Sequence, residues 1–400
     1  MANVNTFTFD QVATILSSLQ AQVQGVSTIA NTTGEWVSVA QSTLRTGYDP
    51  VLNALSKLLD RTIFSVRPYE EKFRGLEADA IRWGNHTRKL QSIDNDLEDD
   101  DRFSLTDGQS LDHYEVKKPT VLQTNFYGHD VFQQHVTIFR DQLDTAFSGP
   151  EAFGQFLSMV MQNITDQLTQ ARETLARNTL NNLIQGTAAN GPTESTVHLL
   201  TEFNVYTSAS PAYTLADIQA DPGLMEQFWS WVCNRIMEVS RFLTERTILY
   251  HTNPTVGGVA KPIRRHTPVS DQNFYMLSGY KYLVDTMVKS RLFNDEYLSK
   301  TNSAELVNFW QATDTPEEID LLATAMNPLT GDYDIMASSS PISPVLGVIF
   351  DREAAGYVVK QNYTLPTPMN ARGAYSNLYY HQDYQYWNDN TENCVVFLLD

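Results

Sequence analysis

The chain has 400 residues, more than one compact hydrophobic core usually holds, so the sequence predicts two or more lobes. Its apolar fraction of 42% is ordinary for a folded protein and excludes a disordered or fibrous chain. The 47 Asp and Glu outnumber the 28 Lys and Arg and give a net charge of −19. This balance argues against a tight nucleic-acid binder, because such proteins need clustered cations.

The sequence gives no sign of a membrane span or a secretion signal. No stretch approaches the roughly 20 consecutive apolar residues of a membrane helix. The start, from Met1 to Asn5, has neither the basic nor the apolar region of a signal peptide, so export by that route is not expected. Cys233 and Cys394 lie far apart and outside any CxxC spacing, which favours two buried, reduced thiols.

Residues 1–66 predict an N-terminal arm with two short helices. Thr8, followed three residues later by Gln11, has the spacing of a capping box, and an apolar stripe at helical spacing comes next. A second helix is expected at Asp49-Pro50, which suits an N-cap and a first helical turn. The polar residues 31–34 are interpreted as a connector. Both helices have few apolar residues, so they need another surface to pack on.

Residues 67–140 predict a long two-stranded hairpin with a charged tip. One strand is expected near residues 80–83 and a second extended stretch over about 113–138, where Pro119 indicates an edge position. Between them lies the acidic run 94–101. An isolated hairpin is marginal in water, and long loops without a core are uncommon in compact domains. We therefore expect support from outside the hairpin's own lobe, most simply from a neighbouring subunit.

The longest predicted helix begins at Pro150, which suits a first turn, and ends before Gly186, which suits the residue just past a helix end. At ~1.5 Å per residue such a helix would be about 50 Å long. The residues expected to face inward are Phe156, Val160, Ile164 and Leu168. The opposite, polar face is expected to carry Gln162, Asp166, Gln170, Glu173 and Arg177.

The remaining chain mixes helices and strands. Helices are expected over 224–242 and 280–287, a strand over 247–250, and a loop rich in proline and glycine over 254–268. A buried strand with a polar exit is expected over 346–352.

Two more strands are expected to close the chain. One is the aromatic stretch 375–387, in which Tyr380, Tyr384 and Tyr386 share one face. The other is 394–399, whose continuous apolar character suits a central position in a sheet.

The order of these parts resembles the tailed-bacteriophage major capsid fold, an α+β fold shared with encapsulins and with the floor of herpesvirus shells. Two local stretches strengthen the resemblance. The strand Val348-Ile349-Phe350-Asp351-Arg352 with Ala354-Ala355-Gly356-Tyr357 looks like a region late in the central lobe of these proteins, and residues 82–89 look like the base of the capsid hairpin.

The resemblance implies a division of the chain into six segments. These are an N-terminal arm (1–66), an E-loop hairpin (67–140), a peripheral P domain with the spine helix (141–215), an axial A domain (216–356), P-domain return strands (357–388) and a C-terminal strand in the A domain (389–400).

The resemblance also implies a structural role. The chain would assemble into pentamers and hexamers of an icosahedral capsid shell around phage double-stranded DNA, made in the host cytoplasm and found in the virion. Nothing in this sequence resembles the cleavable scaffolding segment of some related capsid proteins, so scaffolding and portal proteins are expected as separate partners, with decoration proteins as an option. A weakly repelling acidic wall would let the DNA slide. An encapsulin-like compartment is the alternative, and a carbohydrate-active enzyme is a lesser one.

Some related capsids join their subunits by a Lys–Asn isopeptide bond. The resemblance places Lys117 and Lys118 on the hairpin and Asn370 near the P-domain return, so these residues are the candidates for such a bond. Lys and Asn are common, and a chain without the bond is the favoured interpretation.

No residue is singled out as catalytic, cofactor-binding or metal-ligating. The acidic run at 94–101 fails as an EF-hand loop, because its sixth and twelfth positions hold Asp99 and Leu105, and a solvated tip is favoured over a cation site. His129 and His135 share a strand face but are well separated. The basic patch is interpreted as a solvated loop, in preference to a partner site. It consists of Lys261, Arg264, Arg265 and His266.

The aromatic residues late in the chain suit packing in a core or between subunits better than sugar stacking. They are Tyr375, Tyr379, Tyr380, Tyr384, Tyr386 and Trp387. A carboxylate pair of the glycosidase kind is not indicated by any motif.

Overall fold

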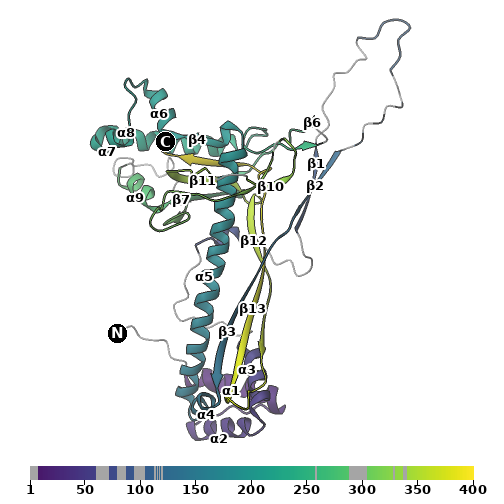
Figure 1. Ribbon diagram of the computed structural model, residues 1–400, viewed down its shortest axis with the longest axis vertical. Coiled ribbons are helices and arrows are strands. Elements are labelled where there is room, and N and C mark those ends of the chain that lie inside the picture. Colours follow the sequence, from purple (N-terminus) through teal and green to yellow (C-terminus); the bar gives the residue numbers. More distant parts are fainter. Residues whose placement is uncertain are drawn as a thin grey trace.

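The computed structural model describes residues 8–59, 72–78, 87–93, 104–111, 114, 116, 118, 120–256, 259–287, 304–327, 329–336 and 340–400. The molecule is elongated (Figure 1). A long helix and a long antiparallel sheet join a helical lower lobe to an upper lobe of sheet and helices, and a hairpin projects from the upper end. Helices and strands mix as expected for an α+β fold.

The lower lobe is built from four short helices packed on the first half of the long helix. Apolar residues from α1 to α3, from α4 and from α5 form one core, in which Trp36 and Phe153 are in ring contact at 5.7 Å. The capping box at Thr8 and the helix at Asp49 are confirmed, and the arm does pack on another surface of its own chain. The helices are α1 (Phe9–Gln24), α2 (Thr33–Leu44), α3 (Tyr48–Leu59) and α4 (Arg140–Ala146).

The second of these helices corrects a sequence prediction. Residues 31–34 are not a connector but the start of α2. The hydroxyl of Thr32 accepts a hydrogen bond from the backbone N–H of Glu35 at 3.3 Å, and the Glu35 carboxylate accepts one from the backbone N–H of Asn31 at 2.9 Å. The polar residues that suggested a connector therefore cap a helix.

The long helix α5 (Pro150–Asn190) begins where predicted and ends five residues later than predicted. Gly186 lies inside the helix. A side chain is not tolerated there, because a Cβ would stand 2.9 Å from the Cβ of Ala325. The inward face is confirmed, with Phe156, Val160 and Ile164 buried and Leu168 packed against the same core.

The polar face of α5 is only partly as predicted. Asp166 and Gln170 are exposed, but Glu173 and Arg177 are buried. Arg177 Nη2 is 2.7 Å from Glu173 Oε1, and its guanidinium lies 3.8 Å from the ring centre of Phe309. Both charges are buried because the second half of α5 enters the upper lobe, where side chains surround it.

A three-stranded antiparallel sheet runs alongside α5 in the order β12-β13-β3 (Figure 1). The predicted aromatic strand is its central member. The second extended stretch of the hairpin is divided at Tyr127, so its C-terminal part pairs with β13 and not within the hairpin. The strands are β3 (Gly128–Phe139), β12 (Ala355–Pro366) and β13 (Tyr375–Asn388).

The upper lobe is built around a five-stranded sheet in the order β4-β14-β11-β7-β8. The predicted strand at 394–399 pairs on both sides and is buried throughout. One face of the sheet packs on the second half of α5 and the other on the upper helices. The strands are β4 (Thr196–His198), β7 (Gln272–Leu277), β8 (Glu305–Val307), β11 (Val345–Asp351) and β14 (Cys394–Leu398).

The predicted helices at 224–242 and 280–287 are confirmed as α8 and α9, whereas the predicted strand at 247–250 is wrong. Only Thr247 forms a bridge, to Arg265, and Ile248 and Leu249 are partly exposed at the surface. The upper helices are α6 (Leu199–Thr207), α7 (Leu215–Ala220), α8 (Pro222–Phe242) and α9 (Ser278–Met287).

The projecting hairpin consists of β1 (Thr87–Ile93) and β2 (Thr120–Phe126), paired antiparallel from Thr87–Phe126 to Ile93–Thr120. The strand expected at 80–83, the acidic run and Pro119 lie outside the described residues. Short elements complete the structure. They are β5 (Thr255–Val256), β6 (Val259–Ala260), β9 (Thr324–Met326), β10 (Tyr333–Ile335) and the 3-10 turns η1 (Arg74–Leu76), η3 (Thr193–Ser195) and η4 (Val269–Asp271).

The two cysteines are free and buried, as predicted. Within the part of the chain that is described, no helix combines the length and the apolar character needed to cross a membrane.

Candidate functional site

The base of the hairpin is joined to the upper lobe by a buried ion cluster. Lys89 on β1 donates a hydrogen bond from Nζ to Asp389 Oδ2 at 2.8 Å and another to Glu392. Asp389 is 0% exposed and Glu392 is nearly as buried. Both acids lie in the short segment between β13 and β14, about 300 residues away in sequence, so the contact fixes the hairpin to the body of its own subunit.

Asp389 is the centre of this cluster, because both oxygens of its carboxylate accept hydrogen bonds. Its Oδ1 accepts hydrogen bonds from Tyr333 Oη at 2.7 Å and from the Thr391 hydroxyl and backbone N–H at 2.6 and 2.9 Å. Burial alone would raise the pKa of this carboxyl, but the Lys89 ammonium and the hydroxyl donors hold its pKa below the ordinary value. The site therefore stabilises a charged carboxylate in the interior.

Arg265 forms the second half of the cluster. Its Nη2 is 3.0 Å from Glu392 Oε1 and donates to the side-chain oxygen of Gln91 on β1, while its Nε donates to the Thr391 carbonyl at 3.1 Å. The predicted basic patch is thus divided. Arg265 holds the hairpin in place, whereas Arg264 and His266 are exposed and Lys261 is partly buried further along the loop.

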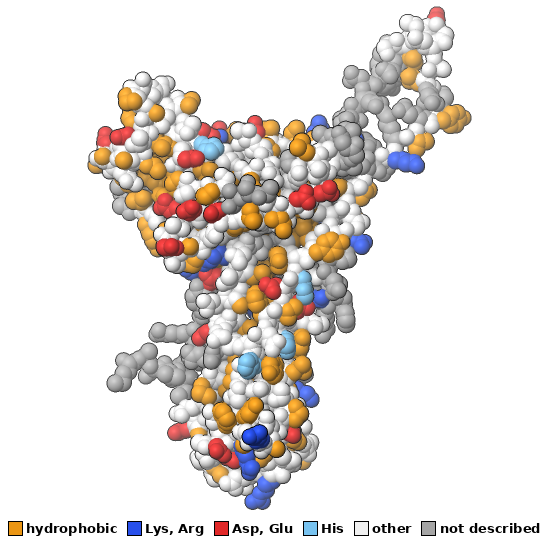
Figure 2. Space-filling model, viewed as in Figure 1, with side chains coloured by type: hydrophobic (Ala, Val, Ile, Leu, Met, Phe, Trp, Pro, Cys, Tyr) orange, Lys and Arg blue, Asp and Glu red, His pale blue; other side chains and the backbone are white. Residues whose placement is uncertain are grey.

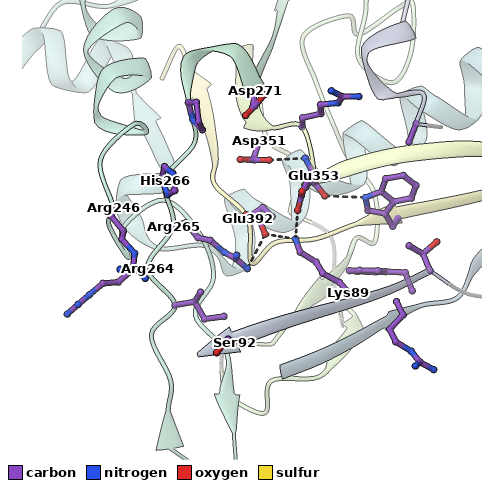
Figure 3. Close-up of a pocket in the computed structure, with 18 residues that line it drawn as sticks. Lys89, Ser92, Arg246, Arg264, Arg265, His266, Asp271, Asp351, Glu353 and Glu392 are labelled. Carbon is purple, nitrogen blue, oxygen red and sulfur yellow. Dashed lines mark hydrogen bonds and ion pairs between the residues drawn. The ribbon is translucent and has the colours of Figure 1, made fainter. Parts of the chain in front are cut away.

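An open cleft of about 980 Å³ lies beside this cluster, between the hairpin base, the loop before β7 and the turn after β11 (Figure 3). Its lining includes six Lys and Arg and four Asp and Glu. Arg88, Arg264 and Arg352 are exposed at it, while Lys89 and Arg265 are engaged in the cluster. Glu353 contributes an exposed carboxylate 3.6 Å from Lys89.

The outer part of the hairpin has a different character. The described residues 104–111 are all exposed, and so are Tyr114 at 88%, Val116 at 76% and Val121 at 61%. In Figure 2 apolar side chains lie open along this projection, away from both lobes. Apolar surface of this kind gains free energy when another surface covers it.

The aromatic residues of β13 point to both faces of the three-stranded sheet. Tyr384 is fully buried in the core of the upper lobe with Tyr386 packed against that core, and Tyr380 is nearly fully buried in the core of the lower lobe, which supports the core interpretation. On the outer face, His135 stacks on Tyr379 at 5.3 Å and His381 stacks on Tyr363 at 4.8 Å.

The two strand histidines predicted to be ordinary do not form a joint site. His129 pairs with Asp383, while His135 lies in the ring stack with Tyr379. Among the described residues, no three His, Cys, Asp or Glu side chains are grouped so that they could hold a metal ion.

Lys118 and Asn370, two candidates for an isopeptide bond, lie at opposite ends of one subunit. Asn370 is in the turn between β12 and β13 beside the lower lobe, where the neighbouring Met369 N–H donates to Asp49 at 3.0 Å. Lys118 is two residues before β2 in the projecting hairpin, and Lys117 is outside the described residues. A bond within one chain is therefore excluded for Lys118, and a bond between subunits stays a hypothesis.

The chain is similar to phage capsid proteins. A family model described as Phi29-like phage major capsid protein matches residues 12–398. A chain of the Staphylococcus phage Andhra capsid has 11% sequence identity and a TM-score of 0.50, over 85% of this chain and 88% of that chain. A chain from the structure of the head fibre and inner core protein of bacteriophage P68 has 12% identity and a TM-score of 0.50, over 85% and 87%. The comparison with curated proteins found no match.

At such low identity the two structures support the fold alone, whereas the family model covers nearly the whole sequence. The resemblance that the order of elements indicated is thereby confirmed, and neither the encapsulin nor the enzyme alternative is favoured. The chain belongs to the Phi29-like phage major capsid protein family, and it is a structural subunit of a phage capsid shell.

Proposed function

We propose that this subunit assembles into pentamers and hexamers that close an icosahedral shell around double-stranded phage DNA. One observation carries the proposal: the hairpin is fixed at its base to its own subunit but exposes apolar side chains along its outer part. A rigid base with an uncovered outer part suits an arm that reaches onto a neighbour. When each subunit makes the same contact with the next around an axis, the subunits form a closed ring.

The parts of the fold have the following proposed roles. The hairpin β1–β2 is the E-loop, α5 with the three-stranded sheet is the P domain, and the five-stranded sheet with α6 to α9 is the A domain. In this division β3 belongs to the P domain, because it pairs with β13, although the sequence boundary at residue 140 assigned it to the hairpin. The helices α1 to α3 form the N-terminal arm.

The proposed shell wall is acidic and has no catalytic role. The net charge of −19 disfavours tight binding of packaged DNA and lets the polymer slide as it enters and leaves. We further propose synthesis in the host cytoplasm, with separate scaffolding and portal proteins. Acidic side chains are frequent over the upper lobe in Figure 2, which is compatible with a repelling wall.

Assembly of the purified chain tests the proposal directly. Sedimentation velocity over a wide range of protein and salt concentration, with negative-stain images of the same samples, should give rings, capsomers or closed shells. A compact monomer under all of these conditions would contradict the proposed assembly.

A further inference from the structure

The cleft at the hairpin base is unusual in a chain this acidic. Its lining holds six of the 28 Lys and Arg of the chain but only four of the 47 Asp and Glu. Two of those acids are already engaged. Glu392 is paired with Lys89 and Arg265, and Asp351 accepts hydrogen bonds from the Thr267 hydroxyl at 2.7 Å and the Glu353 backbone N–H at 2.9 Å.

Three exposed guanidinium groups remain at the cleft for an outside partner. Arg88 comes from β1, Arg264 from the loop before β7, and Arg352 from the turn after β11. They arise from three distant parts of the sequence, and the buried cluster fixes two of those parts against each other through Lys89 and Arg265. In Figure 3 Arg264 lies at the outer rim, beside Arg246 and His266. The cations of β1 and of the loop before β7 are therefore held in fixed relative positions at the opening, where the exposed carboxylates of Asp271 and Glu353 also lie.

The sequence contains one strongly acidic segment, the run 94–101, with six carboxylates in eight residues. It follows β1 directly, and β1 is held extended by its pairing with β2 as far as Ile93. The described residues 104–111 lie at the far end of the projecting hairpin, away from its base at β1 and β2 (Figure 1). The eight residues of the run would reach about 26 Å from Ile93 if they were extended at ~3.3 Å per residue, which is enough to carry the run beyond the base of its own hairpin.

We propose that the acidic run 94–101 of one subunit docks in the cleft at the hairpin base of the next subunit. This inference rests on the proposed assembly and names the contact within it. The contact is head-to-tail, because the hairpin of one copy meets the base of another, and a head-to-tail contact that repeats around an axis closes a ring. The acidic run is the chosen occupant because its charge is opposite to that of the exposed arginines at the cleft. Opposite potentials guide two surfaces together and fix how they align.

Charge reversal on each side provides the test. The cleft variant carries Arg264→Glu and Arg352→Glu, and the run variant carries Asp99→Lys and Asp100→Lys. Arg264 and Arg352 are exposed and take no part in the buried cluster. Each variant alone places like charges together, and we expect its assembled fraction to fall about tenfold or more at low salt. The variant with all four changes should regain assembly.

A mixture of the two variants separates contact with a neighbour from contact within one subunit. In a ring of six that alternates the two variants, the native run meets a native cleft and the reversed run meets a reversed cleft, so the mixture should assemble. If the run docked in its own cleft, the mixture would fail although the fourfold variant assembled. That result would overturn the proposal, and so would a fourfold variant that stays unassembled.

Two controls separate a loss of the docking contact from a general effect of charge and from loss of folding. Lys57→Glu with Arg372→Glu changes the net charge of the chain equally at exposed positions of the lower lobe. This control should assemble like the parent, and a loss as large as that of the cleft variant would overturn the proposal. Thermal melting of each variant reports whether the subunit is folded. If the parent itself forms no rings, the proposed assembly fails. If the parent assembles and both single-site variants assemble equally well, only the docking site is wrong.

Discussion

The base and the outer part of the hairpin are continuous in the chain but differ in what stabilises them. At the base, Asp389 is fully buried, Lys89 and Arg265 are mostly buried, and all three have partners in the same chain. In the outer part, Tyr114 and Val116 are largely exposed, and none of the described residues 104–111, 114, 116 and 118 is buried. A subunit built this way fixes the direction of its arm before assembly and leaves the covering of the arm to another chain.

The comparison also corrects the sequence interpretation. The hairpin was expected to need support from outside its own lobe, most simply from a neighbouring subunit. Its base instead has internal support, from the ion cluster and from Phe126, whose ring meets that of Tyr333 edge-on at 5.7 Å. Only the outer part still lacks a partner surface, so any dependence on assembly is confined to it.

The largest loss of subunit stability is expected from a substitution in the lower-lobe core, where contacts are fully formed within one chain. Val160 on α5 is buried among apolar side chains. Val160→Asp should lower the free energy of unfolding by about 4 kcal/mol, because it buries an unpaired charge. Denaturant unfolding of the subunit measures this. A variant that melts and assembles like the parent would show that this face of α5 is wrongly assigned.

A smaller loss is expected at the hairpin base. Asp389→Asn removes one of the two buried carboxylates that pair with Lys89 and should cost about 3 kcal/mol, since Lys89, Tyr333 and Thr391 lose a charged acceptor in the interior. Glu353→Gln is the matched control. Glu353 approaches the same Lys89 at 3.6 Å but is 73% exposed, so its removal should cost less than about 0.5 kcal/mol. Equal losses for the two variants would mean that burial does not distinguish the two ion pairs.

The pH dependence of the base follows from the direction of the Asp389 shift. The pKa of this carboxyl is lower in the folded subunit than its ordinary value of 3.8. Asp389 therefore stabilises the fold above about pH 4, and this stabilisation is lost as the pH falls through the folded pKa. The stability difference between the parent and Asp389→Asn should be constant from pH 5 to 7 and should shrink below pH 4. Melting curves across this range provide the check, and a difference that grows on acidification would contradict the assigned sign.

The sequence predicted those elements whose pattern is local. The apolar stripe of α5 and the continuous apolar run of β14 are visible in single stretches, and both were placed correctly. The pairing of Lys89 with Asp389 joins residues 300 positions apart, and no local pattern carries it. Arg265 was noticed as part of a basic patch, but only the fold supplies the acid that pairs with it.

The burial of Glu173 and Arg177 was missed for a related reason. Helical spacing assigns them to the polar face, and that face is covered only because α5 passes from one lobe into the other. Gly186 suggested a helix end, yet the tight approach of Ala325 explains the same residue inside a helix.

The smallest effect on the isolated subunit should come from shortening the arm. Deletion of residues 94–108 removes no buried contact among the described residues, so the free energy of unfolding should change by less than about 0.5 kcal/mol. Stable shells should nevertheless fail to form. Melting curves and negative-stain images of the same preparation check both halves of this prediction, and normal shells from the shortened chain would contradict it.

Hydrogen exchange on dissociated subunits and on assembled shells tests the central distinction most directly. The strands of the base, Thr87–Ile93 and Thr120–Phe126, should be protected in both states, because their contacts lie within one chain. Residues 104–118 should exchange rapidly in the free subunit and become protected in the shell. Equal protection of the outer part in both states would show that the arm is stabilised by its own chain, and a base that is protected only in the shell would show that the ion cluster does not hold it.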